Sequence, residues 1–195
     1  MIDNIAATLN KVTGEHIVAA LTIACILVML FNRKINVVKV FVEQLKIFKN
    51  NRTQKVSFWD ILSFIVCPLL LSLIMVTWYE FSIKKELAQI LTTAFSLIFT
   101  LLLAFETILV GKKNSTNEVE REVINQTFIS AVSSSVFTLT GIILSITIMF
   151  VSNGITIKIL TTIILTLSFA TVMLLLMIIK RTFKIFMRDN VDNDK

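Results

Sequence analysis

Long apolar runs alternate with short charged segments along this chain, and the lengths of the runs predict helices that cross a membrane. Four runs reach the ~20 mainly apolar residues that a spanning helix needs: residues 59–79, 87–110, 128–151 and 155–179. A fifth run, residues 17–31, is apolar but shorter. We interpret it as a short first spanning helix and not as a cleaved signal peptide, because its charges follow the apolar run instead of preceding it. The predicted fold class is an all-α, polytopic membrane helical bundle with four to five transmembrane helices.

Composition supports the membrane class. Of 195 residues, 55% are hydrophobic and 16% are charged, and the mean hydropathy is +0.83. A soluble domain of this size could not cover so much apolar side chain. We divide the chain into an N-terminal segment with the short helix (1–31), a basic amphipathic connector (32–58), a main bundle of four transmembrane helices (59–179) and a charged tail (180–195).

The cations predict the orientation. Of the 19 Lys and Arg residues, 15 lie in the connector, in the segment 111–127 or in the tail, all on one side of the predicted spans. The positive-inside rule places that side in the cytoplasm. We therefore expect a multi-pass protein of the cytoplasmic (inner) membrane with a cytoplasmic C-terminus. The net charge of +6 then reflects orientation and anionic lipid, and direct nucleic-acid binding is not expected.

Residues 35–49 of the connector have the period of an amphipathic helix, too short and too charged to span. Its apolar face is Val38, Phe41, Val42, Leu45 and Phe48. The helix is expected to lie on the anionic inner leaflet; packing against sister subunits or a soluble partner is the alternative. The cations predicted to contact lipid or a partner are Lys39, Lys46, Lys49, Arg52, Lys112, Lys113 and Arg188.

The span 128–151 carries small and hydroxylated residues on one face. Such a stripe lets helices approach closely and bond across the contact. The residues predicted to pack helices or oligomer subunits are Ser130, Ser134, Thr138, Gly141 and Ser145. A second seam (Ser133, Thr140 and Thr147) indicates a central helix with more than one neighbour; a hydroxyl-lined ion path is the alternative. Ser115 and Glu118 form a capping-box pair, which predicts that this helix begins in the cytosol.

Three further residues mark special positions within the spans. Glu106 is a lone charge in the apolar run LLLAFETILV and predicts a polar partner, either a loop cation or a subunit contact; a proton- or ion-linked role is the alternative. Pro68 predicts a kink near Phe64. The link 152–154 is so short that the last two spans must form an antiparallel hairpin.

The sequence offers no catalytic, cofactor-binding or metal-binding residues. Cys25 and Cys67 lie in apolar runs and are interpreted as buried, inert thiols, and the HExxH, CxxC and GxxxxGK[ST] motifs are missing. An enzyme is not expected.

The order of these features resembles a known family. A short apolar segment and a basic connector precede SFWDILSFIVCPLLLSLIMV, which opens the main bundle, and a final span runs into a charged tail. This layout is similar to the membrane subunit of the Kiwa anti-phage defence system. The resemblance implies a homo-oligomer, a tetramer, that senses phage-induced disturbance and holds a soluble, DNA-binding effector on the cytoplasmic side. The expected function is a non-enzymatic sensor or anchor; a small oligomeric ion channel or transporter is the alternative.

Overall fold

The computed structural model describes residues 17, 20–25, 28, 37–47, 59, 62–112 and 118–193. Residues 37, 38, 118–120 and 184–193 are described by their backbone alone. All regular secondary structure in these residues is helical. The main elements are α2 (Val37–Ile47), the π-helix η1 (Leu62–Val66), α4 (Cys67–Thr77), α5 (Lys85–Lys112), α6 (Glu118–Phe150) and α7 (Gly154–Asn193).

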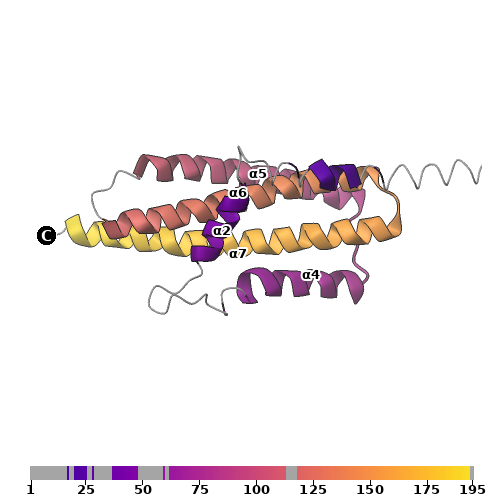
Figure 1. Ribbon diagram of the computed structural model, residues 1–195, viewed down its shortest axis with the longest axis horizontal. Helices are drawn as coiled ribbons and strands as arrows, with labels where there is room; N and C mark the ends of the chain where they lie inside the picture. The colour runs from indigo at the N-terminus through magenta and orange to yellow at the C-terminus, as the bar shows by residue number, and fades with distance from the viewer. Residues whose placement is uncertain are drawn as a thin grey trace, which may run out of the picture.

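Three helices are long and apolar enough to cross a membrane. They are α5 over its full length, the Arg121–Phe150 part of α6 and the Gly154–Phe183 part of α7. All three run along the long axis of the molecule (Figure 1), and α6 packs against both of the others. The expected class, a multi-pass helical membrane protein, is confirmed, and so are three of the expected spans.

In the run 59–79 the continuous helical stretch that the structure describes is shorter than the run itself. The described helical stretch, Leu62–Thr77, joins η1 to α4. It measures ~24 Å at ~1.5 Å per residue, less than the ~30 Å of a bilayer core. The π turn lies directly before Pro68, which occupies the first turn of α4. Proline removes one backbone donor and its ring crowds the preceding turn, so the helix departs from α geometry around Phe64, where Pro68 predicts it.

The segment between α4 and α5 is folded onto the bundle. The Phe81 amide donates to the Met75 carbonyl at 3.1 Å, and the Ile83 amide donates to the Thr161 hydroxyl of α7 at 3.2 Å. Ile83 is buried. The first bond holds the segment against α4, and the second attaches the residues just before α5 to α7.

A tight turn connects α6 to α7. The first helix ends at Phe150 and the second begins at Gly154. The Asn153 side-chain oxygen accepts a hydrogen bond from the Ile155 amide at 3.0 Å and so satisfies one free donor in the first turn of α7. The antiparallel hairpin is confirmed.

Helix α6 occupies the centre of the bundle, in contact with α5, α7 and α2. The largest buried apolar cluster joins Phe95 of α5, Leu144 and Ile148 of α6, and Leu160 and Ile164 of α7. Figure 1 shows α2 running across the bundle axis, whereas the other helices run along it.

Candidate functional site

The hydroxyl face of α6 packs the helices of a single chain together. Ser130, Ser134, Thr138, Gly141 and Ser145 are all buried. Two of the four hydroxyls bond within α6 itself: Ser130 donates to the Gln126 carbonyl and Thr138 to the Ser135 carbonyl, both at 2.9 Å. The Ser134 and Ser145 hydroxyls are buried and have no hydrogen-bond partner among the described residues. Neighbouring helices of the same chain already cover this face, so a contact between copies would have to use other surfaces.

The second seam is also covered. Ser133 and Thr147 are buried and Thr140 is half-buried. Each donates its hydroxyl to a carbonyl one turn earlier in α6, at 2.8 to 2.9 Å. With two buried seams, α6 has the central position that its sequence pattern predicts.

Glu106 contacts a hydroxyl of the neighbouring helix. The Ser135 hydroxyl of α6 donates to Oε1 of Glu106 at 2.6 Å, and Glu106 is half-buried. The sequence predicts a polar partner for Glu106, and a loop cation is one of the candidates. The structure instead supplies a serine, because the carboxylate points across the α5–α6 contact. Lys113, a cation of the segment that follows α5, lies outside the described residues.

Arg181 makes the corresponding contact on the other side of α6. Its Nη1 donates to the Ser130 hydroxyl at 3.3 Å. Ser130 and Ser135 are neighbours on α6, so these two contacts tie α5 and α7 to the same stretch of the central helix.

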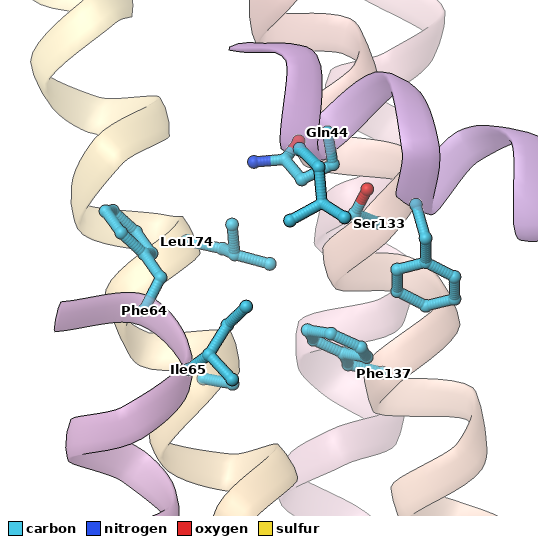
Figure 2. A pocket seen from close by; sticks show the side chains of 9 residues that line it. Gln44, Phe64, Ile65, Ser133, Phe137 and Leu174 are labelled. Carbon is cyan, nitrogen blue, oxygen red and sulfur yellow. The ribbon is translucent and has the colours of Figure 1, made fainter. Parts of the chain in front are cut away.

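A pocket of about 160 Å³ lies where α2 crosses α6. Four elements line it, namely α2, η1, α6 and α7 (Figure 2). The residues labelled there are Gln44, Phe64, Ile65, Ser133, Phe137 and Leu174. Most of the lining is hydrocarbon, and Gln44 and Ser133 supply its polar side chains.

Gln44 is the unusual residue of this pocket. Only 5% of it is exposed, and within the described part of the chain neither its amide nitrogen nor its amide oxygen has a hydrogen-bond partner. Ser133, by contrast, bonds to its own helix. Gln44 is not among the site residues predicted from the sequence, although a glutamine beside the apolar face of an amphipathic helix is a signal for such a buried polar position.

The orientation of α2 differs from the predicted amphipathic face. Phe41 stacks on Phe137 of α6, with 5.3 Å between ring centroids. Gln44 also faces the bundle, whereas Val42 and Leu45 are 45% and 43% exposed. Helix α2 packs across α6 through Phe41 and Gln44. The side that it buries is therefore rotated away from the centre of its apolar face, and part of that apolar face stays uncovered.

The structure describes only some of the predicted contact cations. Lys39 and Lys46 are exposed on α2, and Lys112 is exposed at the end of α5. The backbone of Arg188 is helical, in α7. Lys49, Arg52 and Lys113 lie outside the described residues.

The cysteine prediction is wrong in one respect. Cys25 and Cys67 are free thiols, as expected, but both are exposed. In a membrane bundle an apolar side chain can face lipid as readily as the core, so an apolar run does not bury each of its members.

The structure of this chain defines a multi-pass helical membrane protein. Among the described residues, no group of three or more His, Cys, Asp and Glu side chains could hold a metal ion. No protein-family model, curated protein or solved structure matches this chain.

Proposed function

We propose that this chain is a non-enzymatic sensor or anchor subunit that forms homo-oligomers in the cytoplasmic membrane and holds a soluble protein on the cytoplasmic side. One observation carries the proposal. Helices α6 and α7 continue without a break beyond their apolar parts, at the same end of the bundle (Figure 1).

The dimensions of α7 illustrate this extension. It has 40 residues, or ~60 Å at ~1.5 Å per residue, whereas a bilayer core is ~30 Å thick. Its apolar run ends at 179, and the helix continues to Asn193, further than the sequence predicts. Helix α6 begins at Glu118, about 15 Å of helix rise before the apolar run at 128. A paired helical projection of this length supports a docking role.

The charges on the projection suit a protein partner. The first turns of α6 carry Glu118, Glu120 and Glu122, and the end of α7 carries Lys184 and Arg188. Helix ends whose sequence carries both signs of charge favour a complementary protein surface over a polyanion such as DNA. The resemblance to the Kiwa membrane subunit suggests a tetramer whose partner is a soluble, DNA-binding effector of anti-phage defence.

The alternative is a small oligomeric ion channel or transporter, with Glu106 and the hydroxyls of α6 along its path. The hydrogen bonds favour the anchor. Glu106 accepts a bond from Ser135, and most α6 hydroxyls donate to their own helix. Side chains bonded in this way stabilise the helix contacts and are not free to replace the hydration shell of an ion.

Removal of the projection tests the proposal. A tagged chain that ends at Phe183 should insert normally but lose the partner that co-purifies with the full chain in mild detergent. A matched control reverses two exposed cations at the opposite end of the bundle, Lys84→Glu and Lys85→Glu, and should retain the partner. Equal recovery with the truncated and the full chain would exclude the end of α7 as the docking element.

A further inference from the structure

The pocket between α2, η1, α6 and α7 combines a hydrocarbon lining with one unsatisfied amide. Only 5% of Gln44 is exposed. Both polar atoms of its side-chain amide lack a hydrogen-bond partner among the described residues. Buried polar groups in proteins nearly always have a hydrogen-bond partner. The Gln44 amide therefore marks a position at which a donor and an acceptor from outside the chain would be bound.

The pocket lies at a depth where lipid is the surrounding medium. Ser133 and Phe137 are five and nine residues inside the apolar run that begins at 128, or ~7–14 Å along the helix. Two lining residues, Leu45 and Ile65, are 43% and 46% exposed, so the pocket borders the outer surface of the bundle. A ligand can enter it sideways from the membrane.

The size of the pocket limits the ligand. A cavity of about 150 Å³ lined by aliphatic and aromatic side chains accommodates benzene, and this one measures about 160 Å³. It holds a small head group with the first carbons of one chain, and a two-chain phospholipid is too large. Since the described residues of the lining include no cation, a charged anionic head group would be left unpaired by them and is disfavoured.

We propose that this pocket binds a single-chain membrane amphiphile whose head is a hydroxyl or an uncharged carboxylic acid. Such a head both accepts a hydrogen bond from the Gln44 Nε2 group and donates one to Gln44 Oε1. Its chain lies against Phe64 and Leu174 and leaves the pocket past Ile65. The site does not depend on the docking role proposed above.

Photolabelling with a medium-chain alcohol that carries a diazirine tests the site in the full-length, detergent-solubilised protein. Mass spectrometry of peptides should locate label in α2, η1 and the facing parts of α6 and α7. The competitors are decanol, decanoic acid, methyl decanoate and decane. Decanol, and decanoic acid below its pKa, should compete about fivefold to tenfold better than methyl decanoate, which cannot donate to Gln44 Oε1.

A second pocket provides an internal control. It measures about 200 Å³ and lies between α5 and α7. All the described residues that line it have hydrocarbon side chains: Ile98, Leu101, Leu102, Phe105, Leu175 and Ile178. The probe can enter it, but alcohol and ester should compete there equally. A difference confined to the Gln44 pocket thus reports hydrogen bonding and not general partition of the probe into the protein.

Two variants complete the test. Gln44→Leu should abolish the preference for the alcohol over the ester, and Ala170→Phe, which fills the pocket, should reduce labelling at least fivefold. Gln89→Leu, at an exposed position on α5, is the matched control. It should change neither the preference for the alcohol nor the extent of labelling. Loss of the preference in Gln44→Leu with normal unfolding supports the site. Equal competition by alcohol and ester in the wild type, or labelling that persists in Ala170→Phe, would overturn it, and Gln44 would then be satisfied by water alone.

Discussion

At Gly141 the helices α5 and α6 approach so closely that a Cβ atom would lie 2.9 Å from Cε2 of Phe95. Phe95 is 3% exposed within the main apolar cluster, so its ring has little room to move. Gly141→Ala should therefore destabilise the protein by about 1–3 kcal/mol, despite the better helix propensity of alanine. Thermal unfolding in detergent measures the change.

Gly111 provides the control for that substitution. It also lies in a helix, α5, but a Cβ atom there would meet nothing within 4 Å. Gly111→Ala should leave stability unchanged or raise it by up to about 1 kcal/mol. If the two substitutions had equal effects, the close approach at Gly141 would not limit packing.

The Glu106–Ser135 contact predicts a specific order of substitution effects. Glu106→Gln retains an oxygen that accepts the Ser135 hydroxyl bond and removes a charge from an apolar span, so stability should hold or improve. Glu106→Leu and Ser135→Ala each break the bond and should cost about 0.6–1.7 kcal/mol. A double-mutant cycle measures the coupling. A Glu106→Gln variant as unstable as Glu106→Leu would show that the charge itself is required.

At the scale of the elements, Asn153 fixes the start of α7. Its side-chain oxygen accepts the Ile155 amide bond at 3.0 Å. Asn153→Ala should lower the free energy of unfolding by about 0.5–2 kcal/mol, whereas Asn153→Asp keeps the acceptor and should be nearly neutral. Denaturation in detergent distinguishes the two variants. Equal losses in both would assign the effect to the turn and not to the cap.

The position of α2 depends on the Phe41–Phe137 stack. A double-mutant cycle of Phe41→Ala and Phe137→Ala should give a coupling energy of about 0.5–1.5 kcal/mol, as for other aromatic pairs. Val42→Ala, at an exposed position on the same helix, should couple to neither phenylalanine. Strict additivity of the two phenylalanine variants would mean that α2 does not pack on α6 through this contact.

The sequence predicts some elements better than others, for a physical reason. The length of an apolar run identifies a span, so α5, α6, α7 and the tight hairpin follow directly from the pattern. Which side of a helix faces the core does not follow, because lipid and core are both apolar. In α5, for example, Leu101 is 70% exposed and its neighbour Leu102 only 3%.

The candidate site shows the same limit. A lone carboxylate in an apolar run predicts a polar partner, and Glu106 has one. The identity of that partner depends on how α5 and α6 align, which one helix cannot reveal. The rotation that buries Gln44 and exposes Val42 arises from the crossing of α2 over α6. The residues that stack there, Phe41 and Phe137, are 96 positions apart in the chain.

At the scale of the whole molecule, the distribution of cations predicts a single topology. In intact cells, a cysteine at Asn153 should react with a membrane-impermeant maleimide from outside, and a C-terminal GFP fusion should fluoresce. Cys25 and Cys67, which are exposed thiols, are first replaced by serine. Labelling at Asn153 only after the membrane is opened would invert the proposed orientation.

The proposal of an oligomeric anchor is tested most directly by the composition of the native assembly. The measurement is mass photometry of the tagged chain, purified from its own membrane in mild detergent, with identification of every protein that co-purifies. We predict one defined oligomer that carries a soluble partner in fixed stoichiometry. A defined oligomer without a partner would contradict the anchor, most decisively if Glu106→Gln also altered its conductance in a reconstituted bilayer.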